Sequence, residues 1–329
     1  MKQRLMKACA ARSAAILAAI AVMLSCFGAD TFAYGRIDTA AEASLTAVLT
    51  EEGTGIDGAA FRLYRVADVS DTVEFTLAGD FADAPVSLED VKDSGGWADM
   101  AATLSAYAAA SGISPIQTQT TKENGTVSFS GLKTGLYLLS GDGVILGEDA
   151  CTPAPAIIML PTLSEDDTWD YAPCVEVKYT KAPLAKYQDI TVKKVWDDGG
   201  SSDRPDSVKV QLLRDRGVYE TVVLNADNNW TYTWSGLPCT WTGSNGEMGV
   251  YTYAANESDV PREYTVSVGQ NGSTFTVKNT SKSVTDAPKD PTLPQTGTLN
   301  WPIPVLTVLG LLLVCLGWYL FGGKKKNRS

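Results

Sequence analysis

Short runs in which apolar and polar residues alternate dominate the chain after residue 43. In residues 44–50, Leu45, Ala47 and Leu49 share one face, and this period of two is typical of a half-buried strand. Clusters of Gly and Asp separate this run from the next ones, and such clusters mark turns. The further strand-like runs of this first unit are residues 58–64, 126–129, 136–139 and 157–160.

One segment of the first unit has a different period. Residues 97–107 are rich in Ala, and the large side chains Trp97, Met100, Leu104 and Tyr107 follow the three-and-four spacing of one helix face. The segment predicts a short helix that ends at Gly112 and packs its stripe on a sheet, with no chemistry of its own.

A second set of alternating runs begins near residue 187. Ile190, Val192, Lys194 and Trp196 share one face of the first run. Further runs lie at residues 208–212, 230–234, 251–255 and 275–278. Many short strands at this spacing favour a sandwich. We therefore predict an all-β protein with two β-sandwich domains in tandem, at residues 34–184 and 185–282, and one short helix in the first.

The N-terminal segment predicts a signal peptide over residues 1–33. Basic residues such as Lys2 and Lys7 precede an almost unbroken apolar run at residues 14–24, and small residues allow cleavage after Ala33. A membrane anchor is the alternative, but the run is short for a span.

The C-terminal segment has three parts in a fixed order. A Pro-rich stalk at residues 283–297 ends in a short motif, and a span with a basic tail follows at residues 298–329. The apolar part of that span, residues 301–321, has about the 20 residues needed to cross a bilayer, and the Lys-rich tail marks a cytoplasmic side. The motif is Leu293, Pro294, Gln295, Thr296 and Gly297.

The composition excludes several classes of function. The chain has 27 basic and 38 acidic residues and no His, for a net charge of −11, which argues against nucleic acid as a partner. The absence of His removes Ser-His-Asp and Cys-His catalysis and His-ligated metals. No phosphate-binding glycine motif occurs. We therefore expect no enzyme of a conventional class, no metal and no cofactor.

Three cysteines remain between the predicted leader and span. Cys151 and Cys174 each come just before a strand-like run, and an exported protein forms disulfides readily. We predict that these two pair if their strands are neighbours; two buried free thiols are the alternative. Cys239 is left without an assigned role.

The C-terminal arrangement resembles the sorting signal of Gram-positive surface proteins. That resemblance implies that a sortase cleaves between Thr296 and Gly297 and joins the new carboxyl end to an amine. It implies a secreted protein anchored to the cell wall, with sortase and peptidoglycan as partners, and a membrane span only before cleavage.

Lys194 lies on the face that alternation points inward, where a charge is costly unless it is paired or neutralised. The surrounding sequence resembles the Cna-B-type domain, through Val192-Lys193-Lys194-Val195-Trp196-Asp197-Asp198, Arg204-Pro205-Asp206-Ser207-Val208, Asn228-Asn229-Trp230-Thr231-Tyr232, Gly236-Leu237-Pro238 and Val277-Lys278-Asn279-Thr280. In that family a first-strand Lys and a last-strand Asn form an isopeptide bond with the help of a Glu. Carried over by position, these are Lys194, Asn279 and Glu257. The alternatives are a buried Lys194–Glu257 ion pair with no bond, and Lys193 as the reacting amine.

The first unit resembles the N-terminal domain of Gram-positive pilin subunits. The matching segments are residues 58–64, the Ala-rich helix, residues 131–137 and residues 169–171. The family's unit ends on a Val-Tyr-Pro-Lys motif whose Lys accepts the next subunit; here Tyr179 and Lys181 fit, whereas Thr180 replaces Pro. The resemblance implies that Lys181 is the acceptor, and Lys178 and Lys186 are alternative acceptors. The remaining alternative is that Lys181 is an ordinary solvated lysine with no such role.

The opening strand at residues 44–50 contains no lysine, so we predict a single internal cross-link. The sequence thus predicts a structural surface protein, a pilin subunit that is joined to other subunits or to peptidoglycan. The alternatives are a monomeric wall-anchored adhesin with a host surface ligand, and a minor or basal pilin.

Overall fold

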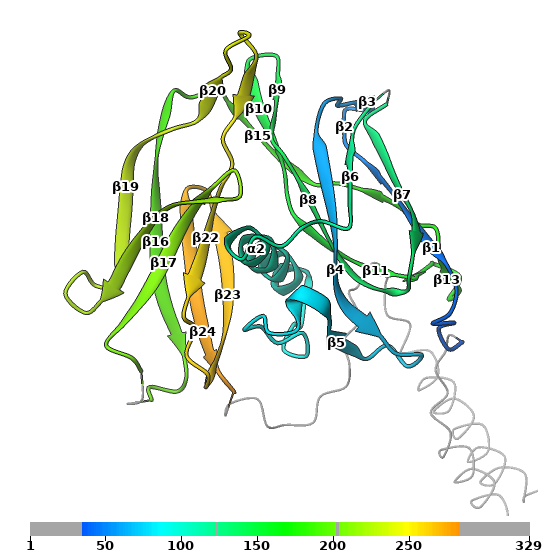
Figure 1. The fold of residues 1–329 in the computed structure, drawn as a ribbon, viewed down its shortest axis with the longest axis horizontal. Coiled ribbons are helices and arrows are strands. Elements are labelled where there is room, and N and C mark those ends of the chain that lie inside the picture. Colours follow the sequence, from blue (N-terminus) through cyan, green and yellow to red (C-terminus); the bar gives the residue numbers. More distant parts are fainter. Residues whose placement is uncertain (1–34, 123, 202–203, 283–329) are drawn as a thin grey trace, which may run out of the picture.

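The computed structural model describes residues 35–122, 124–201 and 204–282 (Figure 1). The predicted signal peptide at residues 1–33, the stalk and sorting motif at residues 283–297, and the span and tail at residues 298–329 lie outside the described residues. Within the described part, no helix is both long and apolar enough to cross a membrane.

The first domain is built from small sheets. A five-stranded sheet has the order β11-β8-β4-β5 with β6 also paired to β4, and two three-stranded sheets have the orders β14-β1-β7 and β15-β10-β9. Short pairs, β2 with β3 and β12 with β13, complete it. The strands are β1 (Ala43–Val48), β2 (Thr50–Glu51), β3 (Thr54–Gly55), β4 (Ala60–Val69), β5 (Phe75–Leu77), β6 (Gln117–Thr120), β7 (Thr126–Leu132), β8 (Gly135–Gly141), β9 (Val144–Leu146), β10 (Asp149–Pro153), β11 (Ala156–Leu160), β12 (Thr162–Leu163), β13 (Trp169–Asp170), β14 (Cys174–Glu176) and β15 (Tyr179–Pro183).

The alternation of the first strand determines which side chains it buries. In β1 every second residue is buried, and Leu45 has no exposed surface. Phe61 and Leu63 of β4 pack in the same cluster, together with Phe129 of β7. Each such side chain contributes about 1.5–3 kcal/mol through its removal from water, so this cluster holds the outer sheets together.

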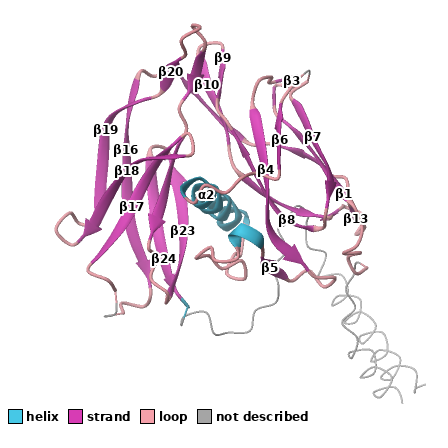
Figure 2. Ribbon diagram, viewed as in Figure 1, coloured by secondary structure: helices cyan, strands magenta, loops and turns pink. Residues whose placement is uncertain are grey.

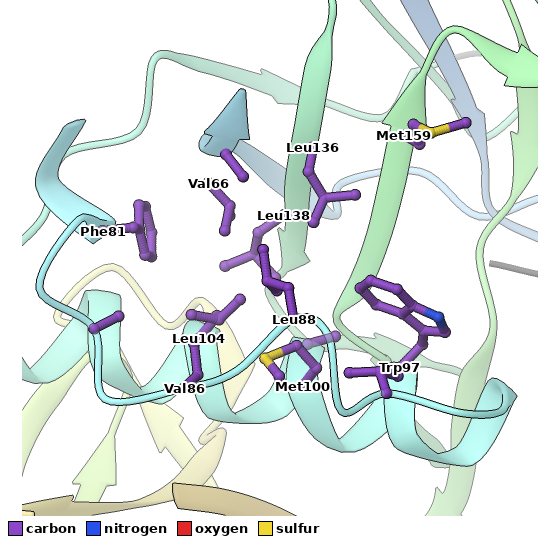
Figure 3. Close-up of a cluster of buried hydrophobic side chains, with 14 of the residues drawn as sticks. Val66, Phe81, Val86, Leu88, Trp97, Met100, Leu104, Leu136, Leu138 and Met159 are labelled. Carbon is purple, nitrogen blue, oxygen red and sulfur yellow. The ribbon is translucent and has the colours of Figure 1, made fainter. Parts of the chain in front are cut away.

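The helix α2 (Ser94–Ala110) supplies the second cluster of this domain. Asp93 caps its N-terminus by accepting from the Gly96 N–H at 2.8 Å. Gly112 follows its last turn with φ of 67°, a conformation that suits glycine. Trp97, Met100 and Leu104 point from the helix toward β8 and its neighbours (Figure 3). The predicted helix is thereby confirmed. A short 3-10 turn, η1 (Gly79–Phe81), adds Phe81 to this cluster.

The second domain is a sandwich of two sheets, with the orders β19-β16-β24-β23 and β18-β17-β22. A two-stranded hairpin, β20 with β21, extends from it. Its core includes Val192, Val210, Leu212 and Val277. The strands are β16 (Tyr187–Asp197), β17 (Ser207–Arg214), β18 (Gly217–Asn225), β19 (Thr231–Pro238), β20 (Thr240–Thr242), β21 (Met248–Val250), β22 (Tyr253–Ser258), β23 (Tyr264–Asn271) and β24 (Thr274–Ser281). The prediction of an all-β chain with tandem sandwiches is confirmed.

The first and last strands of the second domain are neighbours. β16 and β24 pair in parallel, with Lys194 opposite Val277 and Trp196 opposite Asn279. Side chains of directly paired residues lie on the same face of a sheet. This register therefore places the inward face of the first strand beside Asn279.

The helix α2 lies between the two domains (Figure 2). β23 is the edge strand of its sheet, and the first domain caps its free N–H groups. The Val268 N–H donates to Thr103 Oγ1 at 2.8 Å, and the Val266 N–H donates to the Pro85 carbonyl at 2.8 Å. Arg216 adds an ion pair to Asp142 at 3.2 Å. An edge that another chain could have extended is thus covered from within the molecule.

We expect Thr103→Val to destabilise the chain by about 1–3 kcal/mol, because it leaves the buried Val268 N–H without an acceptor at nearly constant volume. Urea unfolding monitored by fluorescence measures the loss. Thr103→Ser keeps the hydroxyl and is the matched control. A valine variant within about 0.5 kcal/mol of the serine variant would show that the contact contributes no net stability.

Candidate functional site

Three buried polar residues meet in the core of the second domain. Lys194 of β16, Glu257 of β22 and Asn279 of β24 are 4%, 4% and 0% exposed. Lys194 Nζ lies 3.4 Å from Glu257 Oε2, and Asn279 Nδ2 donates to Glu257 Oε1 at 2.9 Å. The carboxyl group therefore bridges the amine and the amide, with one oxygen toward each.

Local alternation brings the three together. Ile190 and Val192 are buried on the same face of β16 as Lys194, whereas Lys193 is exposed. Glu257 comes from the opposite sheet, where β22 pairs with β17. The site thus spans the sandwich: amine and amide lie on one sheet, and the carboxyl group comes from the other.

Burial pushes both ionisable groups toward their neutral forms. It lowers the pKa of Lys194 from 10.5 to about 8, although the nearby Glu257 opposes the shift. Burial also raises the pKa of Glu257, against the opposing effects of Lys194 and Asn279. If one proton passes from the Lys194 ammonium to the Glu257 carboxylate, both groups become neutral. A core without water favours that transfer, because it disfavours charged groups.

An aromatic ring lies against the amine. Lys194 Nζ lies 4.2 Å from the centre of the Trp196 ring. Trp196 in turn makes edge-to-face contacts with Trp230 at 5.6 Å and Tyr264 at 5.1 Å. Among the residues that the structure describes, none donates a hydrogen bond to Asn279 Oδ1, and such an unpaired buried group is costly.

The predicted acceptor Lys181 lies outside this core. It is on β15, an edge strand of its sheet, and its side chain is 38% exposed. It pairs with Glu51 and, at 3.3 Å, with Asp149. These two carboxylates raise the pKa of the Lys181 amine, chiefly through their hydrogen bonds. Lys178 and Lys186 are also exposed.

The predicted disulfide is not formed in this structure, in which Cys151, Cys174 and Cys239 are free. Cys151 is buried in β10, and Cys174 is exposed in β14, a strand of a different sheet. The sequence predicts that both cysteines precede strands, whereas both lie within strands, and strand-like runs alone do not show which strands are neighbours. Cys239 is half-buried beside the β20–β21 hairpin.

Within residues 35–122, 124–201 and 204–282, Lys194 is the only buried lysine. In the same ranges no cluster of acidic and Cys side chains has the geometry of a metal site.

The family comparisons agree with this architecture. Residues 190–280 match the model of the Cna protein B-type domain, and residues 34–175 match the N-terminal domain model of the Gram-positive pilin subunit D1. The two resemblances predicted from the sequence are thereby confirmed. The chain carries a Gram-positive pilin D1-type domain followed by a Cna B-type domain.

Individual relatives share parts of the chain. The collagen adhesin of Staphylococcus aureus is 32% identical over 149 residues, which cover 40% of this chain and 12% of that protein. A single B repeat unit of the S. aureus collagen-binding protein has a TM-score of 0.26 at 17% identity, covering 73% of this chain and 99% of the repeat. The full-length major pilin SpaD of Corynebacterium diphtheriae has a TM-score of 0.26 at 13% identity, covering 75% and 99%.

The lowered pKa of Lys194 predicts a stability that rises with pH when no bond can form. In Asn279→Ala, the folded chain loses its Lys194 proton near pH 8 and the unfolded chain near pH 10.5. Between these values the unfolded chain binds more protons, so stability increases with pH, by about 2–3 kcal/mol over the window. Denaturant unfolding from pH 7 to 10.5 measures the rise.

The matched control is the double variant Lys194→Met, Asn279→Ala. It lacks the titrating amine but keeps every other ionisable group, so its stability should be flatter over the same range. Equal slopes for the two chains would show that Lys194 titrates normally in the folded state.

Proposed function

We propose that this protein is a sortase-processed structural subunit of the cell surface, a pilin, which is stiffened by an isopeptide bond between Lys194 and Asn279. The observation that carries the proposal is the buried contact of Lys194, Glu257 and Asn279 across the first and last strands of the sandwich. No cofactor, metal or turnover is required, because the site acts once on its own chain.

The geometry supports a balanced reaction. Lys194 Nζ, as a neutral amine, attacks the side-chain amide carbon of Asn279. Its proton passes to Glu257 Oε2, 3.4 Å away. Glu257 delivers a proton to Nδ2 from Oε1, which lies 2.9 Å from it. A C–N bond forms to Lys194, the C–Nδ2 bond breaks, and one ammonia leaves.

Each feature of the site lowers a different part of the barrier. Burial makes the amine a nucleophile and the carboxyl group an acid. Folding holds the reactants together, which replaces a bimolecular encounter. A single carboxyl group between the two nitrogens can take one proton and give another without a water molecule.

The product would change how the domain bears force. β16 enters the sandwich at Tyr187 and β24 leaves it at Ser281, and the two strands are parallel. Tension on the two ends therefore loads their shared hydrogen bonds in shear. A bond from Lys194 to Asn279 would carry this load covalently, which suits a fibre subunit.

We expect the chain of residues 34–296 to weigh less than its sequence mass by one ammonia. Lys194→Ala, Asn279→Ala and Glu257→Gln should each restore the full mass, since each removes a reactant or the proton carrier. Lys193→Ala is the matched control, because its side chain is exposed beside the site, and it should keep the deficit. Intact-mass spectrometry measures the loss. A parent chain with its full sequence mass would show that Lys194 and Glu257 form only a buried ion pair.

Polymerisation would use Lys181 and Thr296. Lys181 is partly exposed on an edge strand just before the second domain, so an enzyme can reach it. Its pairing with Glu51 and Asp149 favours the ammonium form. The transferring enzyme must therefore remove a proton before the amine can accept the threonyl end.

An immunoblot of wall extracts, released with a peptidoglycan hydrolase and boiled in denaturant, tests this step. We expect a high-mass ladder in the parent and monomer in Lys181→Ala. Lys178→Ala and Lys186→Ala are the matched controls, because both lysines are also exposed, and they should keep the ladder because Lys181 remains. A ladder that survives Lys181→Ala would move the acceptor to one of these two. A single wall-linked band in the parent would favour an adhesin or a basal subunit, which the similarity to the collagen adhesin also supports.

A further inference from the structure

A second buried charge lies next to the reacting site and takes no part in the reaction. The Asp198 side chain, just after β16, has no exposed surface. It accepts from Arg204 Nε at 2.7 Å and from Arg204 Nη2, from the Gly200 N–H at 3.0 Å, and from the Tyr264 hydroxyl at 3.1 Å. Arg204 is the main reason that the pKa of Asp198 lies well below its usual range.

This network reaches the amine through Trp196. Tyr264 contacts the Trp196 ring edge-to-face at 5.1 Å, and the Arg204 guanidinium lies 5.8 Å from the same ring. The ring itself lies 4.2 Å from Lys194 Nζ. Among the described residues, neither Asp198 nor Arg204 forms a hydrogen bond or an ion pair with Glu257 or Asn279. Stability alone explains the pair poorly, because the Arg204 side chain is 36% exposed and an ion pair that water reaches contributes little to stability.

We propose that Asp198, Arg204 and Tyr264 are positioning residues that hold Trp196 against Lys194, so that the amine stays dry and aimed at Asn279. The inference rests on the proposed cross-link. The ring has two opposing effects on the amine: its face attracts an ammonium, and its bulk excludes water. Burial is the largest cause of the lowered pKa of Lys194, and the Trp196 ring lies against the amine that is buried.

The direct electrostatic effect of these charges on Lys194 predicts different cross-linking rates for the variants than a positioning role does. The charged and titratable groups around Lys194 are Glu257 on β22, Asp198 and Arg204 beside it, and Tyr264 on β23. Through space, Arg204 lowers the Lys194 pKa and Asp198 raises it. If only these charges mattered, Asp198→Asn would speed the reaction and Arg204→Ala would slow it. If Trp196 must be held in place, both variants slow it.

The experiment measures cross-linking as the chain folds. The chain of residues 34–296 is made by cell-free translation, synthesis is stopped, and samples quenched in acid are weighed for the loss of ammonia. We expect Asp198→Asn, Arg204→Ala and Trp196→Leu to be about tenfold slower at pH 7, the effect of one unit in the Lys194 pKa. Their rate–pH profiles should move to higher pH, and raising the pH should restore the rate.

Controls separate positioning from loss of structure. Lys209→Ala breaks an exposed ion pair of the same domain, to Asp259 at 3.3 Å, and should react like the parent. Arg204→Lys should react at an intermediate rate, because lysine keeps the charge but not the two-pronged contact. Tyr264→Phe removes only the hydroxyl that donates to Asp198, and it should still shift the rate–pH profile to higher pH. If Asp198→Asn does not fold, this variant tests the positioning role in its place.

The outcomes are distinguishable. A faster Asp198→Asn with a slower Arg204→Ala, or parent-like rates and pH profiles in Asp198→Asn, Arg204→Ala and Tyr264→Phe, would overturn the positioning role and leave the cross-link intact. A parent that never loses ammonia would overturn the proposed cross-link itself. Slow variants whose rates do not recover at high pH would point to general destabilisation and also contradict the proposal.

Discussion

Lys194 and Glu257 meet where neither side chain is exposed to water, and most of the second domain is arranged around that constraint. A buried amine and a buried carboxyl group are tolerable only if they lie together, so β16 and β22 must face each other across the core. Asn279 must then fill the remaining side, which fixes the register of β24 on β16. Trp196 lies against the amine, and Trp230 and Tyr264 pack against Trp196. A shift of one residue in β16 would expose Lys194 and bury Lys193, so the polar triad also specifies the strand register.

The helix of the first domain ties this core to the rest of the molecule. α2 buries Trp97, Met100 and Leu104 against the sheets of its own domain, while Thr103 binds the edge of β23. β23 pairs with β24, which carries Asn279. The first domain therefore supports the strand next to the one that carries Asn279, and hydrogen bonds as well as a linker join the two domains.

Local sequence predicts a feature well when its cause is local. Alternation alone placed Lys194 inward, and the spacing of Trp97, Met100 and Leu104 alone predicted the helix. β18 escaped prediction because its first five residues are all exposed and show no alternation. The burial of Asp198 escaped it too, since the hydroxyl of Tyr264 that helps to compensate its charge comes from 66 residues further along the chain. The contact of Thr103 with Val268, 165 residues away, depends on domain docking, and no local pattern encodes it.

The parallel pairing of β16 with β24 has a consequence for how a cross-linked chain survives damage. With Lys194 joined to Asn279, the covalent path between the two ends of the domain bypasses β17 to β23. A protease that cuts a turn in that bypassed stretch, such as the one between β17 and β18, would open the polypeptide without parting the two ends. In a chain cross-linked in this way, the surface turns of the sandwich could be cleaved, or could vary in length and sequence, and the two ends of the domain would stay covalently joined.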